Sequence, residues 1–400
     1  MRRSSDIALR RYGALAAFIC SFWSHAPWAH ADPFVPARDD QLIERLPVVA
    51  GPSGLELREA IAAASRDPKV ALRLARGYIR FGQEESNPRY FGYAEGILST
   101  WWQKLTPNTD AVLLRAIIRQ DRHDFEGALL DLRTVLQVQP SNNQAWLTYA
   151  AISKLLGRFD DARDSCAVLA RASEPLLAIT CLCEVNSLTG SAPESFDVLR
   201  QLLDDRKTVS VEQRRWTLTV LAEIAARLDK SVEAEALFKK ALSIMKPSAY
   251  LLGVYADFLI DQDRPGDVVA TLGETTHIDS LLLRLALAQQ LLNSGDVEEL
   301  RRIIAERFVE SRRRGENIHL GDEARFTLYL LGKPGRALQL ARENWKSQHA
   351  PQDARVLLEA ATASGDESAK REAAAFLLRT GMAEAQLARL ATRAKHVGGR

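Results

Sequence analysis

Apolar residues recur every three or four positions along most of this chain, from Leu55 to about Thr392. This spacing places them on one face of a helix, and Gly, Asp or Pro interrupts it every twelve to twenty residues. A half-buried strand would require apolar and polar residues to alternate, and we find no convincing stretch of that kind. The pattern therefore predicts an all-α protein built from successive helical pairs.

Within this pattern, the stretch from Thr109 to about Glu174 contains two copies of one 34-residue unit. Small residues at its eighth and twentieth places would let two helices approach closely within each copy. The second copy has Trp146, Tyr149, Ala150, Gly157, Phe159, Ala162 and Cys166 at fixed offsets, and the first has Val112, Arg115, Ala116, His123, Phe125, Ala128 and Leu132, with Pro140 at its end.

These residues resemble the tetratricopeptide repeat (TPR), whose signature is W-x2-L-G-x2-Y, then A-x3-F, then P. The resemblance implies an α-solenoid in which stacked helical pairs share one continuous core. Arg115 and Arg119 depart from it, because they replace the large apolar residues expected at the seventh and eleventh places. Beyond Glu174 the same spacing continues, but it matches the repeat less well. We therefore expect one elongated solenoid over residues 54–392, followed by a basic tail over 393–400. A seam in the solenoid is expected near Arg312 to Glu316, where the helical pattern is interrupted.

The first helical pair is irregular. Ala75 and Ala94 are nineteen residues apart where the repeat expects twelve, and we expect a loop around Gln83 to Arg89 to absorb the extra seven. Trp101 falls at an inward position. Trp102 either packs under that loop, which we favour, or stays exposed, because adjacent helical residues diverge by about 100°.

The beginning of the chain has the layout of a secretory signal peptide over residues 1–31. Four arginines precede a short apolar run, and Ala29-His30-Ala31 supplies the small residues that a signal peptidase reads. The apolar run, about eleven residues, is too short to span a ~30 Å hydrocarbon core, so we expect cleavage rather than a membrane anchor. Residues 32–53 contain four prolines and predict an extended lead-in. The expected location is therefore outside the cytoplasm, in a bacterial periplasm or secreted.

Removing residues 1–31 takes away four arginines and one aspartate, which leaves 53 − 4 = 49 basic and 51 − 1 = 50 acidic residues. A net charge near −1 gives no electrostatic reason to expect nucleic acid or an anionic membrane surface as a partner. The one basic cluster consists of Arg301, Arg302, Arg307 and Arg312 to Arg314, and it is interleaved with Glu298, Glu299, Glu306 and Glu310. Such interleaving favours a salt-bridged, solvated helix face over an anion site.

Cys166, Cys181 and Cys183 remain after cleavage, and an oxidising compartment permits one disulfide. Cys166 lies on the second helix of one unit, and the other two lie on the first helix of the next. Residues two apart on a helix differ by about 200°, so only one of them faces Cys166. We favour Cys181, with Cys183 a buried thiol; the alternative is three reduced core cysteines.

No motif for catalysis or for cofactor binding occurs in the sequence. G-x-S-x-G, a Walker-type loop, G-x-G-x-x-G and H-E-x-x-H are all missing, and the histidines lack metal-ligand spacing. His123 falls in an interhelical turn where glycine is common. The sequence therefore predicts neither an enzyme nor a cofactor.

In the TPR family, ligands usually meet places 2, 5, 9 and 12 of each unit, on the concave face. Chaperone-binding members place Lys and Asn there, and this chain departs from that pattern. Its predicted face is partly apolar, which suits a helix or an extended segment of another protein. The candidate partner-binding residues are Leu113, Ile117, Gln120, Leu147, Lys154 and Trp216.

The function predicted from the sequence is a non-catalytic scaffold or adaptor that binds a partner protein or peptide in the cell envelope. It requires Leu113, Leu147 and Trp216 to be exposed in an apolar groove. The alternative is a helical superhelix that holds glycan during peptidoglycan or exopolysaccharide handling, which requires a polar groove with stacked aromatic residues. The alternative reading of the apolar residues is that they only support packing.

Overall fold

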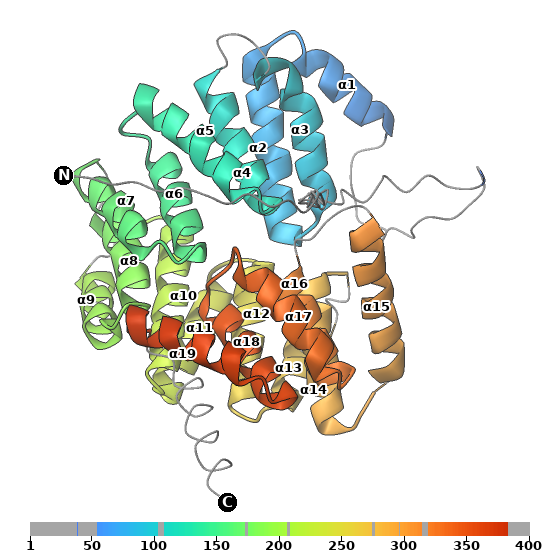
Figure 1. Cartoon of the computed structure of the whole chain (residues 1–400). Helices are drawn as coiled ribbons and strands as arrows, with labels where there is room; N and C mark the ends of the chain where they lie inside the picture. Colours follow the sequence, from blue (N-terminus) through green and yellow to red (C-terminus); the bar gives the residue numbers. More distant parts are fainter. Residues whose placement is uncertain are drawn as a thin grey trace, which may run out of the picture.

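The computed structural model describes residue 38 and residues 54–102, 108–172, 175–205, 209–273, 277–295, 297–313 and 319–382, and in these ranges the chain is helical without strands (Figure 1). The all-α prediction is therefore confirmed. The elements are α1 (Gly54–Ala64), α2 (Pro68–Glu85), α3 (Pro88–Trp102), α4 (Thr109–Asp121), α5 (Phe125–Val138), α6 (Asn143–Leu155), α7 (Phe159–Ala172), α8 (Pro175–Ser187), α9 (Ala192–Asp205), α10 (Val211–Arg227), α11 (Ser231–Ile244), α12 (Ala249–Asp261), α13 (Pro265–Leu272), α14 (Asp279–Leu292), α15 (Val297–Arg313), α16 (Leu320–Arg325), the π-helical η1 (Phe326–Leu330), α17 (Pro334–Trp345), α18 (Pro351–Ser364) and α19 (Glu367–Thr380).

Some of the predicted segments lie in parts of the chain that the structure does not describe. The predicted signal peptide, the lead-in apart from Arg38, and the basic tail lie outside the described residues, as do residues 314–316 of the predicted seam and residues 383–392 of the predicted solenoid. Within the described ranges, no helix has both the length and the hydropathy needed to cross a membrane.

The repeat is visible in the turns between paired helices. Each described hairpin, from α2–α3 to α18–α19, has a residue with positive φ in its turn, a region that Gly enters freely and Asp, Asn and His enter more readily than other residues. These residues are Ser86, His123, Gly157, Gly190, Asp229, Asp263, Gly295, Gly332 and Gly365. Side-chain caps then begin the next helix, as where Asn142 accepts a hydrogen bond from the Ala145 amide at 3.0 Å. His123 thus takes the place of a turn glycine.

The first pair differs from its prediction. No long loop spans Gln83 to Arg89, because α2 continues to Glu85 and α3 begins at Pro88. The extra residues lengthen the helices, and Ser86, with φ of 46°, makes the turn. Trp102 ends α3, which begins just after that turn, so our preferred packing for it is wrong. Its ring is half-buried against the α1–α4 core, with the Arg115 guanidinium 5.8 Å from the ring centroid.

The two arginines that depart from the repeat have a shared partner inside the α4–α5 pair. Asp131 has a side chain only 4% exposed, and it accepts hydrogen bonds from Arg115 at 2.6 and 2.8 Å and from Arg119 at 2.9 Å. Burial of a charge is tolerated when it is paired and hydrogen-bonded. An ion-paired cluster therefore replaces apolar contacts in this unit.

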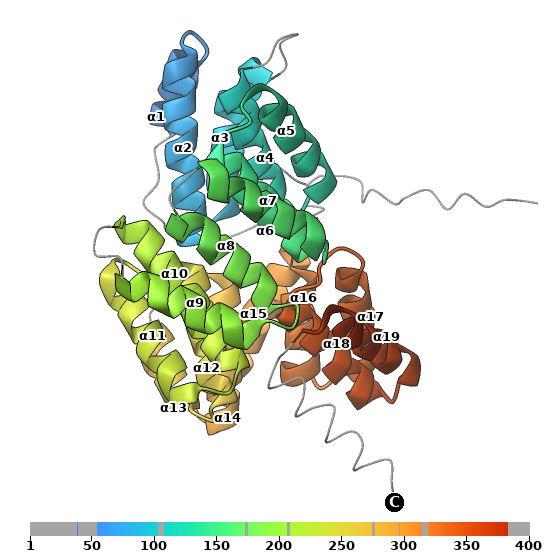
Figure 2. The same ribbon diagram turned by 90° about the vertical axis from the view of Figure 1, so that its left-hand side faces the viewer.

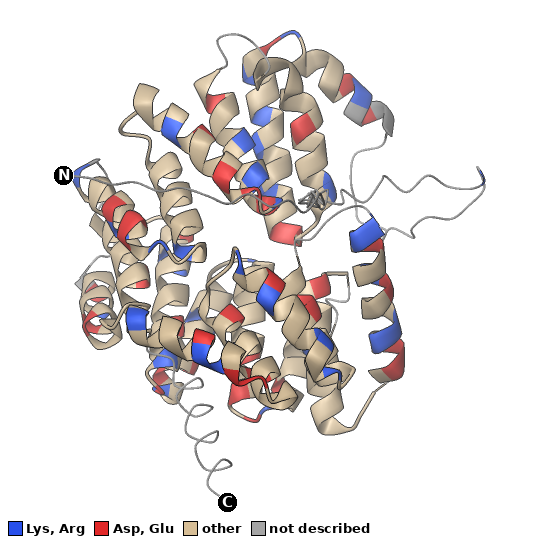
Figure 3. Ribbon diagram, viewed as in Figure 1, with Lys and Arg blue, Asp and Glu red and all other residues tan. Residues whose placement is uncertain are grey.

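The predicted salt-bridged face lies on α15, where Figure 3 shows acidic and basic residues interspersed along the helix. Arg302 contacts Glu299 at 2.8 Å and Glu306 at 2.7 Å, and Arg301 pairs with Glu298. The interpretation of this cluster as a salt-bridged surface is confirmed.

The solenoid curls back so that its C-terminal pairs contact its middle, rather than extending as an open superhelix (Figures 1 and 2). One hydrophobic cluster joins α6, α7 and α8 to α16 through α19. Within it the Phe159 and Phe376 ring centroids are 6.4 Å apart. The His349 amide donates to the Leu155 carbonyl at 2.7 Å, and the backbones of the turn glycines Gly190 and Gly381 meet. We call this contact the closure.

A disulfide joins Cys166 of α7 to Cys181 of α8, with their Cα atoms 5.5 Å apart, and Cys183 is a buried free thiol. The favoured pairing of Cys166 with Cys181 is therefore confirmed. Both cysteines belong to the hydrophobic cluster of the closure, so the disulfide holds together the two helices onto which the C-terminal pairs pack.

Replacing Cys166 and Cys181 together with alanine should lower the free energy of unfolding by about 3 kcal/mol, since closing a loop of this length restricts the unfolded chain by roughly that amount. The sequence separation is 15 residues. Urea titration measures the loss, and Cys183→Ala, which keeps the disulfide, is the control. Mass spectrometry of unreduced peptides that finds free thiols at both Cys166 and Cys181 would contradict the pairing.

Candidate functional site

The concave side of the solenoid lines an interior cavity of about 2210 Å³ that is partly open to solvent. The first helices of four successive pairs, α6, α8, α10 and α12, supply much of its wall. The turn between α2 and α3, the end of α4 and the beginnings of α14 and α18 supply more. Because the C-terminal pairs contact α6–α8, the beginning of α18 adds a further side to the predicted groove, which stays partly open to solvent.

Four of the six candidate residues lie on the cavity wall, namely Gln120, Leu147, Lys154 and Trp216. Leu113 does not, because it is only 7% exposed in the core that α4 shares with α5 and α6. The expectation that Leu113 is exposed is therefore wrong. Ile117 is half-buried against the core of α1 to α4. As partner-binding residues, the four that line the cavity remain predictions.

Along α10 the wall residues follow helical spacing, so Trp216, Thr219, Glu223 and Arg227 lie on one face. The Tyr250 hydroxyl, from α12, donates a hydrogen bond to Glu223 Oε1 at 2.9 Å. Tyr250 is 59% exposed, and it is part of the cavity wall. Burial raises the pKa of Glu223. An accessible tyrosine and a desolvated carboxylate thus share one wall.

Two cations adjoin this wall and have other contacts. Lys154 pairs with Glu184 of α8, and the Arg227 guanidinium donates to the Ser187 hydroxyl at 2.7 Å. These contacts join neighbouring first helices across the concave face. They also leave Glu223 without an ion pair within the described part of the chain.

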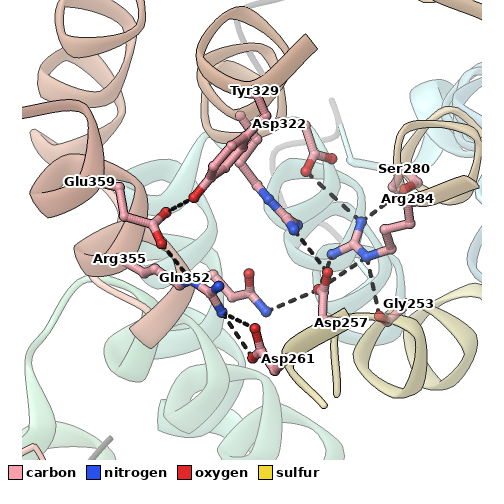
Figure 4. A network of polar contacts seen from close by, with 11 residues as sticks. Gly253, Asp257, Asp261, Ser280, Arg284, Asp322, Tyr329, Gln352, Arg355 and Glu359 are labelled. Atoms are coloured by element: carbon pink, nitrogen blue, oxygen red, sulfur yellow. Dashed lines mark hydrogen bonds and ion pairs between the residues drawn. The ribbon is translucent and has the colours of Figure 1, made fainter. Parts of the chain in front are cut away.

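A buried network of charged residues fastens the C-terminal pairs to α12 and α14 (Figure 4). At its centre is Asp257, whose side chain is 6% exposed. Arg284 donates to it at 2.6 and 3.0 Å, Arg325 at 2.9 Å and Gln352 at 3.0 Å. Burial alone would raise the pKa of Asp257, but the two guanidinium groups hold that pKa at about 2. Asp257 is therefore ionised at neutral pH.

The network continues one turn further along α12. Arg355 of α18 contacts Asp261 at 2.7 and 2.9 Å and Glu359 at 3.0 Å, and the Tyr329 hydroxyl bonds to Glu359. Sequence reasoning missed this network. The only available signal was charge at i,i+4 spacing on two otherwise apolar helices, which is also typical of an ordinary surface pair.

A second, small cavity of about 220 Å³ lies where the α4–α5 turn meets the C-terminal pairs. Gln348 lies 3.3 Å from His123 Nδ1 there. Burial, and then the nearby His319, lower the pKa of His123 to about 4. Burial raises the pKa of Asp353, on the same cavity wall, to about 6. Acidification therefore acts in opposite directions on these two groups.

His123→Asn should weaken the loss of stability on acidification. The native state keeps His123 neutral while the unfolded chain protonates it near its ordinary pKa of ~6.5, so its contribution is complete above about 6.5 and disappears as the pH falls towards 4. At about 1.4 kcal/mol per pKa unit, the difference between pH 7 and pH 4 should shrink by up to ~3 kcal/mol. Asn tolerates the left-handed backbone, where φ is 57°.

Urea titrations of wild type and variant at both pH values measure this change. The contribution of Asp353 is present in both proteins and cancels. Equal pH dependence in the two proteins would contradict a buried neutral His123.

Within the described ranges, no group of three or more His, Cys, Asp or Glu side chains is placed to hold a metal ion. The cavity wall instead offers apolar, aromatic and charged side chains to a ligand.

Of the comparisons with known proteins, the one with solved structures finds similar chains. No protein-family model and no curated protein matches the chain. Among solved structures, it is similar to a tetratricopeptide repeat protein from Parabacteroides merdae ATCC 43184, at 12% sequence identity and a TM-score of 0.36, over 63% of this chain and 98% of that chain. The class that the fold itself defines is an all-α solenoid of helical pairs.

Proposed function

We propose that this protein is a non-catalytic scaffold of the cell envelope that holds a segment of a partner protein in its interior cavity. The observation that carries the proposal is the cavity itself, whose wall is the inward face of four stacked first helices. Leu147, Trp216 and Tyr250 give this wall apolar and aromatic contact area, which is the kind of surface that anchors protein partners.

The size of the cavity favours an extended ligand. Pockets for small molecules usually measure about 300 to 1,000 Å³, whereas this one measures about 2210 Å³. A helix or an extended segment of a protein fills such a volume and can use several wall residues at once. A binding role needs no catalytic group.

Two features support the envelope as the location. The first 31 residues have the signal-peptide layout, and the Cys166–Cys181 disulfide suits an oxidising compartment. Both fit a protein that works after export.

Crosslinking and pull-down from envelope extract test the proposal. Leu147→Asp and Trp216→Ala should each reduce the recovery of a specific partner by tenfold or more, because they alter the cavity wall. Leu130→Asp is the matched control, since Leu130 is 60% exposed on α5 and is not part of the cavity wall. Retention of every partner by both wall variants would overturn the proposal.

The glycan alternative also needs a test. Trp216 and Tyr250 lie on a partly polar wall, and sugar rings stack well on aromatic faces. A glycan array with the purified protein separates the two. Binding of a glycan that Trp216→Ala abolishes, together with no protein partner, would favour glycan handling.

A further inference from the structure

We propose that Glu223, Tyr250 and Trp216 form a binding site for an organic cation, an ammonium or guanidinium group, on the cavity wall. The cation would be a basic side chain of the segment that the cavity holds. This inference rests on the proposed function and deepens it by naming the chemistry that the wall recognises.

The first argument is the position of the three residues. Trp216 and Glu223 are seven residues apart on α10 and so lie on the same face of that helix, two turns from one another. Tyr250 reaches Glu223 from α12 with a hydrogen bond of 2.9 Å. All three line the cavity, and Tyr250 is 59% exposed. A ligand in the cavity therefore has access to this carboxylate and to aromatic surface beside it.

The second argument is that Glu223 stands apart from most other carboxylates of the wall. Six of them have a cationic partner within 4.0 Å, namely Glu85, Glu184, Asp257, Asp261, Asp279 and Asp322. Glu223 has the Tyr250 hydroxyl as its hydrogen-bond donor and no ion pair in the described part of the chain. A desolvated carboxylate with one neutral donor gains much from a cation that arrives with the ligand.

The nearby cations do not supply that partner. Lys154 pairs with Glu184, and Arg227 donates to the Ser187 hydroxyl. The positive charge of Arg227 lowers the pKa of Glu223, but burial, the larger cause, and the charge of Glu184 raise that pKa, and the net direction is upward. The carboxylate is thus incompletely neutralised by the protein itself.

The third argument is the aromatic surface beside the carboxylate. The charge of the wall as a whole is nearly balanced, because Lys246, Arg325 and Arg355 pair with wall carboxylates from outside the wall. Recognition of a cation therefore depends on the local site, where cations bind over the faces of Trp and Tyr with about 0.5 to 2 kcal/mol per contact.

Isothermal titration calorimetry with two probes tests the site. Acetylated, amidated tetralysine represents a basic polypeptide, and spermidine represents a free organic cation. Wild type should bind tetralysine, and Glu223→Gln should weaken that binding at least tenfold. Glu372→Gln, on the exposed surface of α19, is the matched control and should bind as wild type does.

A second variant and a pH series separate recognition from misfolding. Tyr250→Phe keeps the aromatic ring and the fold but removes the hydroxyl. It should therefore cause only a slight rise in the pH below which tetralysine binding is lost. It should also weaken the affinity for tetralysine less than Glu223→Gln does. In wild type, affinity should increase as the pH rises and Glu223 ionises, whereas in Glu223→Gln the affinity should lose this dependence.

Equal binding of tetralysine by wild type and Glu223→Gln would overturn the cation site and leave the scaffold proposal to the pull-down. Failure of both probes to bind wild type would overturn it as well. Glu223-dependent binding of spermidine without binding of tetralysine would support the cation site and overturn its assignment to a polypeptide. If instead the pull-down variants retain every partner while Glu223-dependent cation binding persists, the site stands and the scaffold proposal fails.

Discussion

Replacing Asp257 with alanine should lower the free energy of unfolding by about 3 to 5 kcal/mol, because it leaves buried guanidinium groups without their carboxylate. Arg284 and Arg325 both have side chains only 11% exposed, and Asp257 is the carboxylate that both contact within 3.0 Å, whereas Asp322 lies 4.0 Å from Arg284. The loss should be largest for the C-terminal pairs, since Arg325 and Gln352 attach them to α12. Urea denaturation followed by circular dichroism measures it.

The matched control is Asp267→Ala. Asp267 also pairs with an arginine, Arg264, at 2.6 Å, but its side chain is 51% exposed. Exposed ion pairs contribute about 0 to 1 kcal/mol, so this variant should unfold almost as wild type does. Similar losses in the two variants would contradict a buried network around Asp257.

Phe376→Ala should cost about 3 to 5 kcal/mol, the range for truncating a buried phenylalanine in a well-packed core. Phe376 is 5% exposed, and its ring lies 4.9 Å from Trp345, 5.3 Å from His349 and 6.4 Å from Phe159. The substitution removes contacts on both sides of the closure. It should therefore also increase amide exchange at His349, whose N–H donates to Leu155.

Leu378→Ala, two residues further along α19, is the control, because Leu378 is 84% exposed. Its unfolding free energy should stay within about 0.5 kcal/mol of wild type. A Phe376→Ala protein as stable as the control, or with unchanged exchange at His349, would show that the ring makes no cohesive contact with α7.

Much of the fold follows from local sequence. Helical periodicity located the helices because each pair buries its own apolar stripe, and small residues such as Ala116 and Ala150 marked where paired helices approach. Rotation along α8 showed that only one of Cys181 and Cys183 can face Cys166, and Cys181 was the preferred partner. The sequence did not predict the longer helices of the first pair. An inserted loop and a longer helix both increase the number of residues between Ala75 and Ala94, so the spacing alone cannot distinguish them.

The closure lacked any such signal. Phe159 and Phe376 are separated by more than 200 residues, and each occupies a position that packing within its own pair also explains. Gly157 and Gly190 were identifiable as turn residues, but nothing local indicates that their turns also contact His349 and Gly381. Asp257 and Arg325 are 68 residues apart, so their pairing depends on the curvature of the whole solenoid.

The candidate site, like the fold, was only partly predictable from the sequence. The inward face of α6 and α10 followed from the repeat register, which is why Leu147, Lys154 and Trp216 line the cavity. Leu113 failed because α4 contributes only its C-terminal end to the wall, and its earlier turns pack against α5 and α6. Tyr250 was not identified, although it too lies on the first helix of a pair and lines the cavity.

The cavity owes its shape to the contact between the C-terminal pairs and α6–α8. Nuclear Overhauser effects between aromatic rings in selectively labelled protein test it most directly. A cross-peak between Phe159 and Phe376 is the predicted result, with the Trp345–Phe376 cross-peak, within the C-terminal pairs, as the internal control. A Trp345–Phe376 cross-peak without a Phe159–Phe376 cross-peak would contradict the closed solenoid.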